Sequence, residues 1–173
     1  MKLSIIDDIL HENDFNDISN IIMENIDFTW RYHRDIELND NSKFFYMVHS
    51  FYRVNDISVE EHVPVIDHYY EVLEPLTSMF SEMGLKWWRI KCNLYPATES
   101  LKQHAFHIDN KVPHIAGLFS LNTCDGYTEF EDGTKIESIA NRFFLFDGAI
   151  KHASTTTTNA LARFNINFNF YPK

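Results

Sequence analysis

The sequence has few of the residues that mark specialised structural classes. Its two cysteines, Cys92 and Cys124, lie far apart and form no CxxC pair, which argues against a disulfide framework and a structural zinc site. No apolar run approaches the roughly 18 residues that a membrane-spanning helix needs. The acidic residues near the start, in MKLSIIDDILHEND, are unlike those of a signal peptide. We therefore expect a cytoplasmic protein that does not cross a membrane.

Basic residues are also scarce compared with acidic ones. There are 15 Lys and Arg against 25 Asp and Glu, which gives a formal net charge of −10. Binding to a phosphate backbone needs clustered basic side chains, so nucleic acid is disfavoured as a partner. The composition is 45% hydrophobic and 15% aromatic, which is typical of a globular chain with a sizeable core.

Glycine and proline are too sparse to form a linker, with five of each in 173 residues. We therefore predict a single domain over residues 1–173. Within it, residues 1–84 are expected to form a helical N-terminal support with short strands. Residues 85–171 are expected to form a strand-rich core.

Two helices are predicted in the N-terminal part. Apolar residues recur at helical spacing over 13–25, and Asn13 or Asp14 is a candidate N-cap. A second helix is predicted from about Val59 or Pro64 to Met83, with a kink or break at Pro75. Gly84 follows as its stop signal.

After Gly84 the pattern changes to short strands. In WWRIKCNLYP, at 87–96, apolar and polar residues alternate, and Asp-Gly pairs at 125–126, 132–133 and 147–148 punctuate the segments that follow. The last strand places Arg163, Asn165, Asn167 and Asn169 on one face and aromatic or aliphatic residues on the other. Helices followed by strands predict an α+β fold, an antiparallel sandwich or barrel with the helices packed on one outer face.

Three residues in this strand-rich half suit a metal site. His107 and Asp109 are two apart in HAFHIDN, and His152 follows in KHAS. Residues two apart on an extended segment lie on the same face, and a second strand that folds back can bring in the other His. Two imidazoles and one carboxylate on one face of an octahedron suit iron(II) and leave positions open for other ligands. Among the remaining His residues, His104 is the main competitor of His107, but it has no acid two residues on.

A cation on the last strand suits a carboxylate ligand. Arg163 can hold a carboxylate through two parallel hydrogen bonds, and Asn165 on the same face can add another. Tyr95 and Asn93 share the polar face of 87–96. We expect Tyr95 to contact the same ligand from the opposite wall.

The ordered set of HxD, a distal His and an Arg resembles the 2-oxoglutarate/iron(II)-dependent dioxygenases. The resemblance covers roughly residues 85–171 and is closest to the prolyl-hydroxylase-like branch, where a strand ending in Tyr precedes a loop and HxD, as in CNLYPATESLKQHAFHID. Ala97 stands where that loop usually has Gly. GYTEFEDG resembles the family's Gly-Gly-x-Leu-x-Phe hairpin, with Tyr127 at the second Gly, and RFFLFDGAIKHAS resembles the strand leading to the distal His.

The resemblance implies a fold and a reaction. The fold is a double-stranded β-helix, or jelly roll, with the N-terminal helices packed on one sheet. The reaction is a hydroxylation in which iron(II), 2-oxoglutarate and dioxygen are used, and succinate and carbon dioxide leave. His107, Asp109 and His152 would be the metal ligands and catalytic residues, and Arg163, Tyr95, Asn93 and Asn165 would contact 2-oxoglutarate.

The substrate and the oligomeric state are not readable from the sequence. A prolyl residue of a peptide or protein is the leading candidate substrate, followed by a free amino acid or small metabolite. Two other classes remain open: a cupin-like metal-dependent isomerase or epimerase, and a non-catalytic jelly-roll binding module. Turnover of 2-oxoglutarate that depends on iron would separate the oxygenase from both.

Overall fold

The structure is a computed structural model that describes residues 3–34, 44–54 and 64–171. Along the chain the elements are β1 (Ser4–Ile6), α1 (Glu12–Met23), β2 (Arg31–His33), β3 (Tyr46–Arg53), β4 (Val65–Ile66), a 3-10 helix η1 (Tyr70–Leu73), α2 (Glu74–Glu82), β5 (Trp87–Pro96), β6 (Ile115–Ser120), β7 (Tyr127–Phe130), β8 (Lys135–Glu137), β9 (Arg142–Asp147), β10 (His152–Ser154) and β11 (Ala162–Phe170). The chain is therefore mostly β, as the alternating patterns after Gly84 predict.

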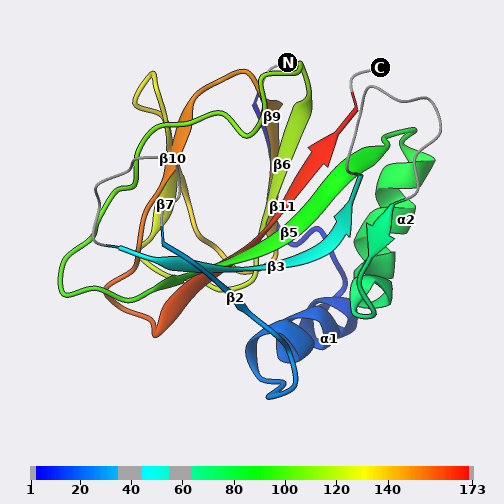
Figure 1. The fold of residues 1–173 in the computed structure, drawn as a ribbon, viewed down its shortest axis with the longest axis horizontal. Helices are drawn as coiled ribbons and strands as arrows, with labels where there is room; N and C mark the ends of the chain where they lie inside the picture. The colour runs from blue at the N-terminus through cyan, green and yellow to red at the C-terminus, as the bar shows by residue number, and fades with distance from the viewer. Residues whose placement is uncertain (1–2, 35–43, 55–63, 172–173) are drawn as a thin grey trace.

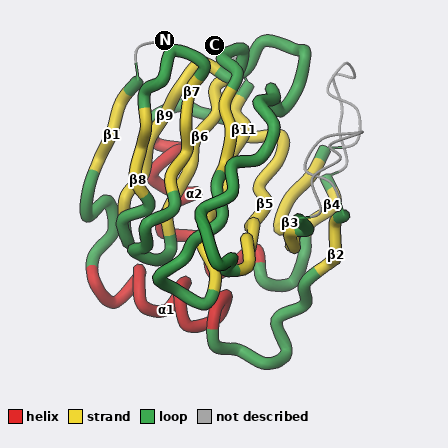
Figure 2. The backbone as a smooth tube through the Cα atoms, turned by 90° about the vertical axis from the view of Figure 1, so that its left-hand side faces the viewer, coloured by secondary structure: helices red, strands yellow, loops and turns green. Residues whose placement is uncertain are grey.

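The strands form two antiparallel sheets. The large sheet has the order β1-β9-β6-β11-β5-β3-β2, with β4 paired to β3, and the small sheet has the order β10-β7-β8. Figure 2 shows β1 at one edge of the large sheet and β2, β3 and β4 at the other. Strands from both halves of the chain thus build the large sheet, because β1 to β4 all precede residue 84.

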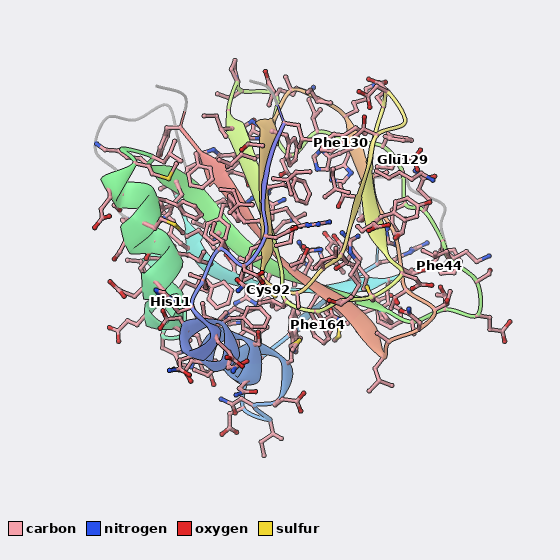
Figure 3. All side chains as sticks on the ribbon, turned by 180° about the vertical axis from the view of Figure 1, so that it is seen from behind. His11, Phe44, Cys92, Glu129, Phe130 and Phe164 are labelled. Carbon is pink, nitrogen blue, oxygen red and sulfur yellow. The ribbon has the colours of Figure 1, made fainter. Side chains whose placement is uncertain are left out.

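The apolar face of the large sheet packs against the helices. Buried side chains of β5 and β11 meet those of α1 and α2 in one cluster, whose fully buried members include Ile18, Leu76, Ile90, Ile166 and Phe168. In Figure 1, α2 lies beside the large sheet and α1 below it, while β7 and β10 of the small sheet lie on the far side. Figure 3 marks Phe130 and Glu129 on β7, away from both helices.

Helix α1 begins slightly earlier than predicted. Its N-cap residue is His11, which makes no side-chain capping hydrogen bond, so the predicted caps Asn13 and Asp14 were wrong. Glu12 and Asp14 lie in the first turn instead, where negative charge is favourable next to the free backbone N–H groups. Ile18 and Ile22 anchor the helix to the core.

The second predicted helix is shorter than expected. Val59 and the residues up to 63 lie outside the described residues, Pro64 precedes β4, and the α-helix begins only at Glu74. Pro75 lies in its first turn, where no N–H is needed, so of the predicted kink or break the kink was wrong, whereas the α-helix does start next to Pro75. Gly84 adopts a positive φ of 72° and ends the helix, as predicted.

The later strands follow the predicted pattern closely. Strand β5 spans the predicted residues 87–96, and Gly133 of the Asp-Gly turn between β7 and β8 has a φ of 85°. Cys92 and Cys124 are both free thiols. Within the described ranges, every helix is too short or too polar to span a bilayer.

Candidate metal centre and its cavity

His107 and His152 face each other across an isolated antiparallel bridge. The backbone N–H of each residue donates to the carbonyl oxygen of the other, both at 3.0 Å. Side chains of directly opposed residues in such a pair lie on the same side, and here the two ring centroids are 4.7 Å apart. The bridge therefore brings together two imidazoles that are distant in sequence.

Asp109 completes a three-residue cluster. It lies two residues after His107, on the same side of the extended segment. One ligand atom from each of His107, Asp109 and His152 lies within 4.8 Å of the other two. The three residues predicted from the spacing are thus close enough to bind one metal ion, and two imidazoles and a carboxylate are the donor set of a non-haem iron(II) site.

Both imidazoles are oriented by the backbone. Nδ1 of His107 is 3.2 Å from the carbonyl oxygen of Ala105, and Nδ1 of His152 is 3.2 Å from that of Ile150. With the proton on Nδ1, each ring donates to its carbonyl and presents the lone pair of Nε2. This is the common arrangement of metal-binding histidines, in which the second ring nitrogen is fixed by a hydrogen bond.

His152 is held in its neutral form by its surroundings. Burial next to Phe146, whose ring centroid is 5.0 Å from that of the imidazole, lowers the pKa of His152 to about 4. Since metal binding needs the neutral ring, no proton has to be displaced from His152 at neutral pH.

Three side chains of the large sheet hold the Asp109 carboxylate. Nη2 of Arg89 is 3.0 Å from Oδ1, and the amides of Asn167 and Asn169 donate to Oδ2 at 3.0 and 2.9 Å. Burial favours the neutral acid, but the charges of Arg89 and Lys91 and these amides hold the pKa of Asp109 well below its usual range. Asp109 is therefore ionised and ready to bind a cation.

The sequence pattern does not identify Arg89, Asn167 and Asn169 as partners of Asp109. The alternation with apolar residues does place Arg89 on the polar face of β5 and the Asn residues on the polar face of β11. The missing information was the register: Arg89 pairs with Asn169, and Lys91 pairs with Asn167. Cross-strand neighbours share a face, so these polar side chains all point to the same side as Asp109.

The three candidate metal ligands line a cavity of about 300 Å³ between the two sheets. Its wall is formed by Tyr46, Arg89, Lys91, Asn93, Tyr95, His107, Ile108, Asp109, Leu118, Thr128, His152, Ser154 and Asn167. Most of these side chains are polar or charged. The cavity therefore suits a small polar ligand better than an apolar one.

Arg163 is fully buried and joins the two sheets. From β11 its Nη1 donates to the carbonyl oxygen of Tyr127 at 2.7 Å, and its Nη2 donates to Oγ1 of Thr128 at 2.9 Å. Gly126 makes room for it, since a Cβ there would lie 2.7 Å from Cδ of Arg163. Arg163 does not line the cavity itself but touches Thr128, which does.

Tyr95 lies next to Arg163 and not on the opposite wall. The two residues are register partners on β5 and β11, and the guanidinium carbon is 5.8 Å from the centre of the Tyr95 ring. The predicted position of Tyr95 was therefore wrong, because the sequence could not show that β5 and β11 are neighbours. Burial raises the pKa of Tyr95 to about 12, so its hydroxyl stays protonated.

Buried donors without partners gather near Arg163. Within the described residues, Nε of Arg163, Nδ2 of Asn165 and Oγ of Ser120 are buried and make no hydrogen bond. Asn165 pairs with Ser120 on β6 and with Asn93 on β5, whose amide donates to Oδ1 of Asn165 at 2.8 Å. Unpaired buried donors are costly, so this group is suited to an acceptor such as a carboxylate.

Lys91 is the remaining cation on the wall of the cavity. Burial, followed by the nearby charge of Arg89, lowers the pKa of Lys91 to about 8. Its Nζ lies 6.0 Å from the centre of the Tyr46 ring. In the sequence, Lys91 belongs to the polar face of this strand, together with Asn93 and Tyr95.

His104, the competitor of His107, lies outside the metal cluster. Its Nδ1 is 2.9 Å from Oγ of Ser154, and its ring packs on Tyr95 with centroids 5.3 Å apart. His49 is likewise engaged elsewhere, between the carbonyl of Thr29 and the carboxylate of Asp67. In the described part of the chain, no other group of three His, Cys, Asp or Glu lies close enough to hold an ion.

Comparisons with known proteins identify the fold. No protein-family model and no curated protein sequence matches the chain. Among solved structures, a prolyl hydroxylase from Trichoplax adhaerens, in complex with a peptide fragment of the hypoxia inducible factor oxygen degradation domain, matches with a TM-score of 0.68 and 14% identity over 98% of this chain and 83% of that one. An oxidoreductase of the 2OG-Fe(II) oxygenase family from Burkholderia pseudomallei gives 0.70 and 11% over 97% and 84%.

A Pseudomonas putida prolyl-4-hydroxylase also matches, with a TM-score of 0.62 and 10% identity over 98% of this chain and 92% of that one. The chain therefore has the fold of the 2-oxoglutarate/iron(II) oxygenases, including prolyl hydroxylases. The resemblance inferred from HxD, the distal His and Arg163 is confirmed at the level of the fold.

Proposed function

We propose that the chain is a single 2-oxoglutarate- and iron(II)-dependent dioxygenase domain that hydroxylates its substrate. The observation that carries this proposal is the cluster of His107, Asp109 and His152 on the wall of a polar cavity, in the fold shared with these oxygenases. Their protonation states also fit, since Asp109 is ionised and His152 is neutral.

His107, Asp109 and His152 would hold iron(II) at the wall of the cavity. When bound, the metal supplies the activation of dioxygen that couples decarboxylation of 2-oxoglutarate to hydroxylation. Arg89, Asn167 and Asn169 orient the Asp109 carboxylate, which is the usual task of groups that contact metal ligands.

The far carboxylate of 2-oxoglutarate would be held near Arg163. Nε of Arg163, Nδ2 of Asn165 and Oγ of Ser120 are the unpaired donors that such a group would satisfy. Tyr95 and Asn93 line the cavity and also contact this group: the Asn93 amide donates to Asn165, and the Tyr95 ring lies beside the Arg163 guanidinium. A carboxylate bound there requires the wall to move, since Arg163 does not line the cavity but donates to Thr128, which does.

For the substrate, a prolyl residue of a peptide or protein is the first candidate. It is motivated by the fold shared with prolyl hydroxylases, one of which is in complex with a peptide. A free amino acid or small metabolite is the second candidate, and the modest cavity volume favours it.

The proposal is tested by reconstituting the protein with iron(II), 2-oxoglutarate and dioxygen. We expect succinate to form only when all three are present, and a mass-spectrometric screen of proline-containing peptides and free amino acids to find a product with one added oxygen. Asp109→Ala should abolish succinate formation and metal binding. His68→Ala is the matched control, since His68 is exposed and lies outside the cluster.

The competing functions give different results in the same experiment. A cupin-like isomerase or epimerase would convert its substrate without consuming 2-oxoglutarate. A non-catalytic binding module would give no succinate even with the metal bound. Tight binding of iron(II) or zinc(II) by Asp109→Ala at the wild-type affinity would refute the assignment of this carboxylate.

A further inference from the structure

Lys91 is placed beside the candidate metal ligands by the pairing of β5 with β11. It is the register partner of Asn167, whose amide donates to Oδ2 of Asp109. Lys91 also lines the cavity, together with Tyr46 from the neighbouring strand β3. Lys91 therefore lines the same cavity as His107, Asp109 and His152, and this cavity with its wall is called the chamber below.

The charge of Lys91 is not compensated within the described residues. No ion pair joins it to a carboxylate there, and the nearest acid, Asp109, is already held by Arg89 and two amides. Asp109 would in addition bind the metal. An ammonium group that is largely removed from water without an acidic partner is costly, so its presence calls for a ligand.

The charges around the cavity also exceed what one carboxylate can balance. Among the residues that line the cavity, Arg89 and Lys91 are cationic and Asp109 is the one acid, and a divalent metal would add two positive charges. This contrasts with the acidic chain as a whole, whose net charge is −10. The local excess favours ligands that bring in carboxylate groups.

Lys91 and Arg163 are separate positions. They lie four residues apart along the paired strands β5 and β11, which is roughly 13 Å at the rise of an antiparallel strand. The Arg163 head group is fixed on Tyr127 and Thr128 of the small sheet. A carboxylate bound by the unpaired donors near Arg163 therefore leaves Lys91 free.

We propose that Lys91 forms a second carboxylate-binding subsite beside the metal ligands. The proposal rests on the function proposed above and extends it. Two sources can supply the carboxylate: the 2-oxo acid, through its 1-carboxylate, or the substrate, as a free amino acid or another small organic acid. In both cases the ammonium group selects a ligand with a carboxylate next to the reacting position.

The first arm of the test measures binding of 2-oxoglutarate. The zinc(II)-loaded protein is titrated by calorimetry as wild type, Lys91→Met, Lys91→Arg and the control Lys86→Met, an exposed lysine outside the cavity. If the 2-oxo acid is the ligand, Lys91→Met should bind 2-oxoglutarate about tenfold more weakly or worse, because a charge-assisted contact is lost. Lys91→Arg should recover part of the affinity, and Lys86→Met should match wild type.

The second arm tests the substrate as the source. With zinc(II) and 2-oxoglutarate saturating, thermal shifts are measured for the L-amino acids and for their uncharged amides. If the substrate is the ligand, an amino acid should stabilise wild type more than its amide does, and Lys91→Met should lose that difference while it binds 2-oxoglutarate normally.

The outcomes separate the two proposals. If wild type binds zinc(II) and 2-oxoglutarate but neither arm distinguishes Lys91→Met from it, the Lys91 subsite is wrong and the oxygenase proposal stands. If wild type binds neither zinc(II) nor 2-oxoglutarate, both proposals fail.

Discussion

Strands β5 and β11 have two faces that differ in almost every physical property. The face toward the helices carries Ile90, Ile166 and Phe168, all fully buried in one aromatic and aliphatic cluster. The face toward the small sheet carries Lys91, Arg163 and the Asn residues, several with buried donors that lack partners. The same two strands thus build a stabilising core on one side and a costly polar chamber on the other.

The two faces contribute differently to the stability of the fold and to ligand binding. Apolar burial on the helix side stabilises the fold by roughly 25 cal/mol per Å² of surface removed from water. On the chamber side, buried charges and unpaired donors oppose folding until a ligand satisfies them. Substitutions of apolar residues on the helix side should therefore lower the free energy of unfolding, whereas substitutions on the chamber side should mainly weaken ligand binding and can raise the stability of the ligand-free protein.

The largest effect is expected on the helix side. Phe80 of α2 is buried against Phe143, Phe168 and Phe170, so Phe80→Ala should lower the free energy of unfolding by about 3–5 kcal/mol. Zinc(II) affinity, measured on the folded fraction, should stay the same because no chamber group is touched. Met83→Ala, at an exposed position beyond the same helix, is the control for denaturation. A large loss of metal affinity in Phe80→Ala would mean that the two faces are coupled.

On the chamber side, Arg163→Ala should act on the ligand. Loss of the partner of a buried carboxylate should weaken 2-oxoglutarate binding by about 2–5 kcal/mol. Zinc(II) binding should be nearly intact, since Arg163 contacts none of the three candidate ligands. Calorimetry on the zinc-loaded protein measures both, with Arg163→Lys as the conservative variant. An unchanged 2-oxoglutarate affinity would remove Arg163 as the anchor and leave Lys91 as the main candidate.

Lys91→Met should stabilise the ligand-free protein, in contrast to Phe80→Ala. The pKa of Lys91 is lowered from 10.5 to about 8, so between these values the unfolded chain binds more protons and stability rises with pH. Below pH 8 wild type bears the full cost of the charged group, and Lys91→Met should be more stable by about 1–3 kcal/mol. Urea denaturation from pH 7 to 10.5 checks this, and the difference should shrink as the pH rises. A constant difference would show that packing, not charge, separates the variants.

The smallest effect is expected where one of several contacts is removed. Asn169→Ala takes away one amide that donates to Asp109 while Asn167 and Arg89 remain. We expect zinc(II) affinity to fall about tenfold, at the low end for groups that support metal ligands. Competition with a chelator measures it, and Asn165→Ala is the matched control because Asn165 does not contact Asp109. Equal losses in both variants would contradict the orienting role of Asn169.

Several residues of the chamber could be predicted because their arrangement depends on neighbours that are close in sequence. The i and i+2 spacing of His107 and Asp109 and the alternation on the last strand depend only on extended backbone, which the sequence pattern reveals. The position of Tyr95 and the role of Arg89 depend on which strands pair and in which register. Those facts arise from tertiary packing, so nothing in the sequence near Tyr95 or Arg89 could show them.

The second helix is shorter than predicted for a related reason. Apolar spacing around Tyr70 and Leu73 fits an α-helix, but this segment forms a 3-10 turn after Val65–Ile66 has paired with β3. A neighbouring strand offers backbone hydrogen bonds that a local pattern cannot anticipate, and it outweighs the modest propensity of a short segment. Pro75 therefore lies at the start of the α-helix and does not kink it.

The backbone bridge between His107 and His152 has a consequence for the order of folding. The bridge closes a long loop that contains β6 to β9, and long-range contacts of this kind form late because loop closure costs entropy. The unfolded chain therefore offers the ion no assembled pair of imidazoles. Metal uptake should follow folding, and metal binding should then stabilise the folded protein by mass action. Removal of the metal by a chelator should therefore speed unfolding but should not prevent folding.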